Sequence, residues 1–160
     1  MKGKMPGVTL IADWDPKPGF KLGSKDIEGR QTYLGSQVWR NPRLEIREYD
    51  IPTPGPEEVL LEVKACGICG SDVHMAQAEQ DGYIYYPGLT GFPCILGHEL
   101  SGVVVEAGKH ARDKRTNKPF KGGEAVTTEE MLWCGQCRPC AEGQPNRCEQ
   151  LDELGFNING

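Results

Sequence analysis

Four cysteines near the end of the chain form the strongest chemical pattern in the sequence. They follow the spacing C-x2-C-x2-C-x7-C within residues 134–148, here named the four-cysteine lobe, and they are Cys134, Cys137, Cys140 and Cys148. Four thiolates with no spare position hold a structural zinc ion tetrahedrally. Gly135, Pro139 and Gly143 suit the tight turns that would bring the sulfurs together. The spacing therefore predicts a structural zinc site.

Two alternatives to structural zinc fit the lobe less well. Merely buried thiols are rarely grouped this densely. An iron–sulfur cluster is the sharper rival, because the first three cysteines match the C-x2-C-x2-C start of a bacterial ferredoxin motif. However, the last gap is seven residues rather than three, and Glu149 rather than proline follows Cys148. Metal analysis would distinguish zinc from the iron of an iron–sulfur cluster.

A second group of residues is spread more widely and points to catalysis. It consists of Cys69, Ser71 and His74, followed later by His98 and Glu99. Cysteine, histidine and carboxylate ligands are typical of a catalytic zinc that keeps one position for water or substrate. Such an ion would lower the pKa of an alcohol oxygen, and Ser71 and His74 could relay the released proton. Singly, each residue fits a structural role as a buried thiol, a surface histidine or a helix start, but the combination favours catalysis.

Short strands must position these groups. Alternating or Val-containing segments predict strands at residues 59–65, 101–107 and 124–128. Residues 37–49, with Asn41-Pro42 between two polar-apolar segments, predict a β-hairpin. Residues 1–35 show no sustained period and are expected to be an N-terminal extension, which leaves residues 36–160 as one mainly β domain. Long helices and repeats are absent from the pattern.

Composition and charge exclude some classes of binding partner. The net charge of −5 and the pI near 5.3 argue against nucleic acid or an acidic membrane surface, so a small soluble substrate is expected. The apolar run at residues 8–12 is shorter than a signal-peptide core of ~7–15 residues, and no run approaches the ~20 residues of a membrane span. We therefore expect a cytoplasmic protein, in which seven cysteines serve as metal ligands rather than disulfides.

Taken in order, these motifs resemble the zinc-containing medium-chain alcohol dehydrogenase family. The match covers residues 63–74 (VKACGICGSDVH), residues 97–102 (GHELSG) with Gly108 downstream, and the four-cysteine lobe, within about residues 36–160. The resemblance implies a GroES-like β-barrel with a zinc-binding lobe. It also implies that Cys69 and His98 are catalytic zinc ligands and that Glu99 is a ligand or lies close behind one. Ser71 and His74 match proton-relay positions, and the four lobe cysteines match the structural zinc site.

The resemblance also implies parts that these residues lack. The remaining active-site residue, a Cys, Asp or Glu, would follow Gly160, and no G-x-G-x-x-G of a Rossmann domain occurs in the sequence. We expect the 160 residues alone to be inactive, and the full-length protein to be a homo-oligomer that oxidises a secondary alcohol of a small polyol or cyclitol with NAD or NADP. The alternative is a non-catalytic zinc module that binds a partner.

The remaining reactive or charged residues are expected to have ordinary structural roles. Cys66 and Cys69 mimic a redox C-x-x-C but lack its helical context, and Cys94 fits a buried thiol. The basic residues of 109–121, which include Lys114, are expected in a solvated loop between two strands. The tyrosines of residues 77–93 could wall a substrate pocket or simply pack a loop; with the extension, they resemble sugar- and cyclitol-oxidising members of the family.

Overall fold

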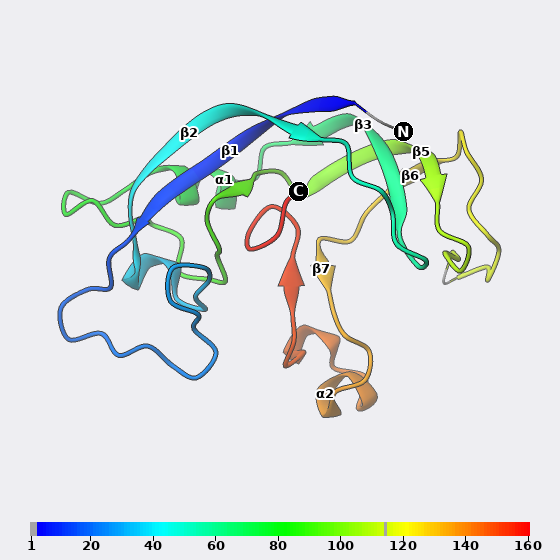
Figure 1. The fold of residues 1–160 in the computed structure, drawn as a ribbon. Helices are drawn as coiled ribbons and strands as arrows, with labels where there is room; N and C mark the ends of the chain where they lie inside the picture. The colour runs from blue at the N-terminus through cyan, green and yellow to red at the C-terminus, as the bar shows by residue number, and fades with distance from the viewer. Residues whose placement is uncertain (1–2, 114) are drawn as a thin grey trace.

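Two small antiparallel sheets form the framework of the computed structural model, which describes residues 3–113 and 115–160 (Figure 1). The first sheet has the order β2-β1-β4 and consists of β1 (Lys4–Trp14), β2 (Trp39–Asp50) and β4 (Cys94–Ile95). The second has the order β3-β5-β6 and consists of β3 (Val59–Gly67), β5 (Glu99–Ala107) and β6 (Ala125–Thr127). The prediction of a mainly β chain with strands near residues 59–65, 101–107 and 124–128 is confirmed.

The remaining elements are short. A ribbon of β7 (Met131–Leu132) and β8 (Asp152–Glu153) projects below the sheets and carries the four-cysteine lobe at its end (Figure 1). The helical elements are η1 (Gly35–Gln37), α1 (Gly70–Ala76), α2 (Arg138–Ala141) and η2 (Pro145–Arg147). No helix in the described part of the chain has the length and apolar character needed to cross a membrane.

The hairpin predicted for residues 37–49 is wrong. From Trp39 onward these residues belong to the single strand β2, which pairs along its length with β1 rather than folding back on itself. The Asn41-Pro42 turn signal marks instead a shift of register opposite Ala12, where Asn41 adopts a φ of 54°. A β-bulge accommodates such a residue without ending the strand, so the distant partner strand decided the outcome.

The N-terminal segment takes part in the same sheet. β1 pairs with β2 from Lys4↔Asp50 to Trp14↔Trp39, and its residues Thr9 and Leu10 pair with β4. Residues 15–38, here named the N-terminal loop, connect β1 to β2 and contain η1. Strand β1 was not predicted because its apolar stretch is short. The domain boundary at residue 36 stays a prediction.

A buried aromatic and aliphatic cluster holds the first sheet against α1. Trp39 lies at its centre, with its ring centroid 5.0 Å from those of both Trp14 and Phe92. The buried members are Leu10, Trp39, Met75, Ile84, Phe92, Cys94 and Phe156. Since Met75 comes from α1 and Phe156 follows β8, the cluster fixes the two segments that flank the candidate site.

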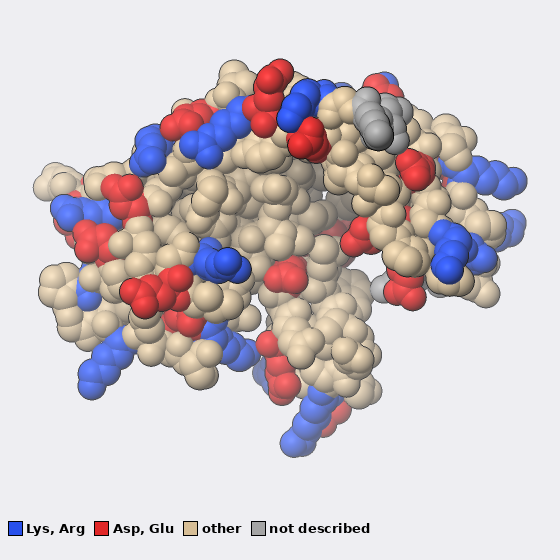
Figure 2. All heavy atoms as spheres, in the orientation of Figure 1, with Lys and Arg blue, Asp and Glu red and all other residues tan. Residues whose placement is uncertain are grey.

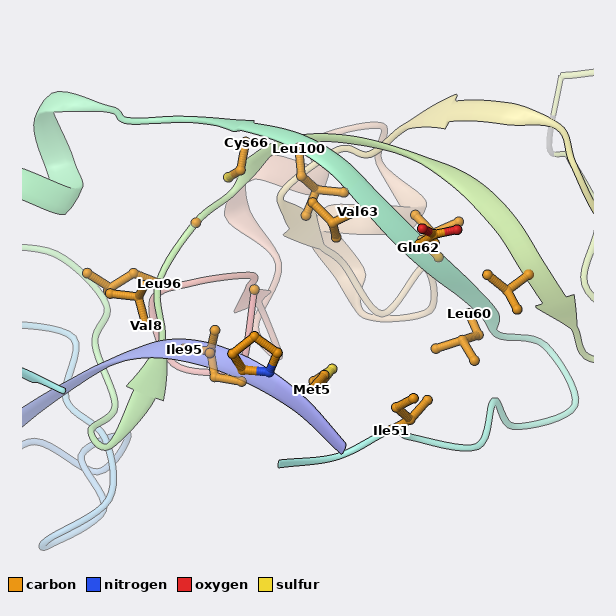
Figure 3. Close-up of a pocket in the computed structure, with 16 residues that line it drawn as sticks. Met5, Val8, Ile51, Leu60, Glu62, Val63, Cys66, Ile95, Leu96 and Leu100 are labelled. Carbon is orange, nitrogen blue, oxygen red and sulfur yellow. The ribbon is translucent and has the colours of Figure 1, made fainter. Parts of the chain in front are cut away.

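Between the two sheets lies an apolar cleft of about 710 Å³. Figure 3 shows Met5 and Ile95 on one side and Leu60, Val63 and Leu100 on the other, all lining the same space. The two sheets are therefore separate layers. Residues 51–58 connect β2 to β3, and residues 96–98, which include His98, connect β4 to β5.

Candidate metal centres and active site

The four-cysteine lobe brings its sulfurs to one point. The four Sγ atoms all lie within 4.8 Å of one another, and those of Cys137 and Cys148 are 4.0 Å apart. Sulfurs at ~2.3 Å from a tetrahedral zinc ion would be separated by roughly 3.8 Å. Gly135 and Gly143 adopt φ values of 74° and 76°, which lets the chain turn sharply between ligands. The donor set and spacing fit zinc.

Backbone amides support thiolate character in the lobe. The N–H groups of Cys134 and Gln150 both donate to the Sγ of Cys148 at 3.3 Å, and that of Cys137 donates to the Sγ of Cys134 at 3.3 Å. The Cys134 N–H, followed by that of Gln150, lowers the pKa of the Cys148 thiol. A thiolate is the form that binds a metal, so these hydrogen bonds favour metal binding by Cys148.

The second cluster joins Cys69, His98 and Glu99. Their ligand atoms lie within 4.8 Å of one another, with His98 buried, Cys69 half-buried and Glu99 exposed. The fold explains the meeting, because Gly67 at the end of β3 pairs with Glu99 at the start of β5. Gly67 must remain small, since a Cβ there would collide with the Glu99 carboxylate. We name this cluster the Cys69 site.

Asp72 supports both inner ligands, although it was not among the predicted site residues. Its Oδ2 accepts the Cys69 N–H at 2.9 Å, and its Oδ1 lies 3.6 Å from the Nδ1 of His98. Those Oδ1 and Nδ1 atoms are buried and have no hydrogen-bond partner among the described residues. A metal-ligating histidine usually directs its other N–H to a carboxylate, so the pair fits a His98 that binds metal through Nε2. An acidic residue three positions after Cys69, at the start of a helix, was the available signal.

The two predicted relay residues lie on α1 but are not joined to each other by a hydrogen bond in the described structure. Ser71 Oγ is 3.3 Å from the Nε2 of His98, so its hydroxyl faces the Cys69 site. His74 is exposed, with its ring centroid 6.4 Å from that of Tyr85. The spacing of three residues places Ser71 and His74 on neighbouring positions of the helix. The relay itself stays a prediction.

Aromatic rings wall one side of His98. The Phe156 ring centroid lies 4.6 Å from that of His98 and 5.3 Å from that of Tyr86. Burial, followed by the charges of Glu153 and Cys69, raises the pKa of Tyr86 to about 12. Tyr86 therefore stays neutral and protonated near pH 7. Of the two aromatic residues Phe156 and Tyr86, only Tyr86 was singled out in the sequence as a pocket candidate, among the tyrosines of residues 77–93.

The residues expected to have ordinary structural roles are placed accordingly. Cys94 is buried, and burial raises the pKa of its thiol to about 12. Arg112, Arg115 and Lys118 are exposed in the loop between β5 and β6, while Lys114 lies outside the described residues. Charges of both signs are interspersed over the face in Figure 2. Cys66 is exposed and free, and its pairing with Cys69 as a redox motif gains no support.

The fold and motifs place the chain in a known family. Residues 55–160 match the family model described as "Alcohol dehydrogenase GroES-like domain", and the chain belongs to this family. The resemblance inferred from the sequence, including its GroES-like fold, is therefore confirmed. The chain spans about 30 to 40% of the length of the curated relatives it matches, since it covers 40% of one and 32% of another.

Several curated relatives are named as dehydrogenases. The chain is 65% identical over 159 residues to scyllo-inosose 3-dehydrogenase from Thermotoga maritima, an alignment that covers 98% of this chain and 40% of the relative. It is 35% identical over 119 residues to L-threonine 3-dehydrogenase from Cutibacterium acnes, covering 74% of this chain and 32% of that protein. These relatives do not favour the alternative of a non-catalytic zinc module.

Solved structures that resemble this chain are also named as dehydrogenases. A structure from Thermotoga maritima, named only provisionally as an alcohol dehydrogenase, has a TM-score of 0.89 at 64% identity and covers 97% of this chain and 40% of its own. A zinc-binding dehydrogenase from Sinorhizobium meliloti 1021, bound to NADP, has a TM-score of 0.59 at 31% identity, covering 82% of this chain and 33% of its own. This neighbour is thus described as a zinc-binding dehydrogenase and holds NADP in its structure.

Proposed function

We propose that this chain is the zinc-binding catalytic part of an NAD(P)-dependent dehydrogenase that oxidises a secondary alcohol of a small cyclitol or polyol. The observation that carries the proposal is the convergence of Cys69, His98 and Glu99 in a chain 65% identical to scyllo-inosose 3-dehydrogenase. The coenzyme would be held outside these 160 residues. We further expect a homo-oligomeric, cytoplasmic protein whose partner is a small-molecule substrate, and we expect the 160 residues alone to be inactive.

The two clusters would hold two zinc ions with different tasks. Structural zinc is proposed for the lobe, with Cys134, Cys137, Cys140 and Cys148 as its complete set of ligands. Catalytic zinc is proposed for the Cys69 site, with Cys69, His98 and Glu99 as ligands. When bound there, the ion supplies Lewis acidity that favours the deprotonated form of the substrate alcohol.

The chain's own residues would orient this site and handle the proton. The Asp72 carboxylate accepts the Cys69 N–H, and its Oδ1, 3.6 Å from His98 Nδ1, would hold that ring in the tautomer whose Nε2 binds metal. Ser71 places its hydroxyl beside His98, where it can accept the proton of the substrate hydroxyl. His74 lies exposed further along α1 and would pass that proton to solvent. Hydride would pass to NAD or NADP from the substrate carbon that carries this hydroxyl.

Kinetics of the full-length protein test this proposal. The zinc-loaded protein would be assayed with scyllo-inosose and related cyclitols, with NAD and NADP supplied separately and coenzyme reduction recorded by absorbance. We expect coenzyme reduction that depends on the cyclitol, together with two zinc ions per chain by elemental analysis. A fully zinc-loaded protein that reduces neither coenzyme with any cyclitol or polyol would disprove the assignment.

A further inference from the structure

The His98 ring is restrained by two segments of the chain that lie on different sides of it. Its Nδ1 edge faces the Asp72 carboxylate of α1, with the Oδ1 atom 3.6 Å away. The ring also packs against Phe156, with the two ring centroids 4.6 Å apart and the ring planes inclined by 37°. Both rings are buried. The carboxylate restrains how the imidazole turns, and the phenyl ring restrains the tilt of its plane, because a buried ring cannot move without displacing its neighbours.

Phe156 belongs to the turn after β8, which comprises residues 154–160. Hydrogen bonds join this turn to the segment that leads into the candidate catalytic site. The Phe156 carbonyl accepts the Gly91 N–H at 2.9 Å. Further along, the Cys94 thiol donates to the Ile158 carbonyl at 3.0 Å. The turn and the segment before β5 are therefore held together at more than one point, and the position of the phenyl ring follows from that attachment.

Two glycines allow the turn after β8 to approach His98 so closely. Gly97, immediately before His98, has a φ of 108°, and Gly155, immediately before Phe156, has a φ of 76°. These are backbone conformations that glycine adopts without steric cost. A Cβ at Gly155 would also lie only 2.6 Å from the Gly97 carbonyl oxygen. Any side chain at position 155 would therefore push the turn, and Phe156 with it, away from the imidazole.

The Asn157 side chain fixes the conformation of this turn. Its Oδ1 accepts the Glu153 N–H at 2.8 Å, and its Nδ2 donates to Asp152 Oδ1 at 2.8 Å. The same Nδ2 donates to Gln31 Oε1 at 3.3 Å, although Gln31 lies in the N-terminal loop. One amide group thus ties the turn both to β8 and to a segment that is distant in the sequence.

We propose that Phe156 is a positioning residue that orients the His98 ring, and that Asn157 holds Phe156 in place. This inference rests on the proposed function, in which His98 is a zinc ligand. Phe156 has no group that can bind zinc or exchange a proton, so it acts only through the imidazole. A ligand that is oriented before the ion arrives loses less conformational freedom on binding, which raises the affinity. Through Gln31, the N-terminal loop contributes to the same support.

The zinc affinity of the Cys69 site tests this proposal independently of turnover. Zinc-loaded full-length protein would be titrated with a chelator, and His98→Ala would identify which ion belongs to the Cys69 site. Phe156→Leu keeps an apolar side chain but removes the ring, and it should lower the zinc affinity of that site by ~10-fold. With zinc in excess, kcat should fall while the KM for the cyclitol stays unchanged, because Phe156 acts through the zinc ligand rather than on the substrate.

Phe92→Leu is the matched control for packing. Phe92 is a similarly buried aromatic residue of the same cluster, and its ring centroid lies 5.0 Å from that of Trp39. Its replacement should lower the thermal stability as Phe156→Leu does, but it should leave the zinc affinity of the Cys69 site unchanged. Equal losses of zinc affinity in the two variants would mean that Phe156 acts only by packing the cluster, and the positioning role would be wrong.

Asn157→Ala tests the same proposal without opening the buried cluster, and it decides the matter if Phe156→Leu does not fold. It should lower the zinc affinity of the Cys69 site by ~3- to 5-fold, because the turn loses its side-chain hydrogen bonds. Asn146→Ala, which changes an exposed amide in η2, should bind zinc as wild type does. Wild-type zinc affinity in Asn157→Ala would overturn the supporting role of Asn157. If His98→Ala keeps both ions, the proposed catalytic zinc site itself fails.

Discussion

Within the four-cysteine lobe, every ligand lies in residues 134–148, whereas the Cys69 site joins two segments almost thirty residues apart. Of the lobe's four cysteines only Cys148 is buried, and the lobe projects from the sheets on a two-stranded ribbon. The Cys69 site instead sits on the buried cluster, with His98 against Phe156 and Asp72 behind it. A local metal site can be built from turns alone, but a site with an open position needs a framework that holds its ligands without the metal.

The comparison implies that the two metals can be lost independently. Ligands in the lobe should matter for local stability, and ligands in the Cys69 site should matter for turnover. Four variants of the full-length protein test this division, in order of decreasing expected effect.

His98→Ala should lower kcat by at least ~10³-fold, because it removes a ligand of the proposed catalytic zinc and the imidazole beside the buried Asp72 Oδ1. Zinc content should fall from two ions to one, with the lobe intact. His110→Ala, which changes an exposed histidine, serves as the control. Turnover near the wild-type rate in His98→Ala would remove the Cys69 site from the mechanism.

Cys137→Ser should release the lobe zinc and open the lobe locally, because few apolar side chains are buried there to hold it. Tryptic cleavage at Arg138 or Arg147 should accelerate by ~100-fold or more, as measured by mass spectrometry of the fragments. Gln136→Ala, an exposed neighbour, should cleave as wild type does. Equal cleavage rates in both variants would mean that the lobe does not depend on metal.

Asp72→Asn should lower either kcat/KM or catalytic zinc affinity by ~10- to 100-fold, because the amide cannot stabilise His98 as a carboxylate does. Metal titration against a chelator and steady-state kinetics would record the two effects. Asp50→Asn, on the exposed end of β2, is the matched control. A loss of stability without any change in zinc affinity or turnover would show that Asp72 only caps α1.

His74→Asn should have the smallest effect, a loss of ~10-fold in kcat at neutral pH. If His74 passes the proton to solvent, the loss should shrink as the pH rises, because hydroxide can then accept the proton directly from Ser71. Added imidazole should restore part of the rate. A loss that is equal at every pH, and that imidazole does not relieve, argues against the relay.

Much of the site was readable from the sequence because its chemistry depends on residue type and short spacing. The structure brings the four lobe cysteines together, and likewise Cys69, His98 and Glu99, which are the two groups singled out from the sequence. Their roles as zinc ligands stay predictions. The strands at Val59–Gly67 and Glu99–Ala107 were also readable, since β-branched residues and flanking glycines mark them.

Tertiary structure decided the parts that depend on distant partners. The bulged strand β2 was mistaken for a hairpin because Asn41-Pro42 is a turn signal locally, and only pairing with β1 overrides it. Asp72 carries only the local signal of an acidic residue at a helix start, since a carboxylate gains its role from the groups folded around it. The sequence by itself determined which atoms can bind metal. Only the packing of β3 against β5, and of the turn after β8 against His98, decided which groups surround them.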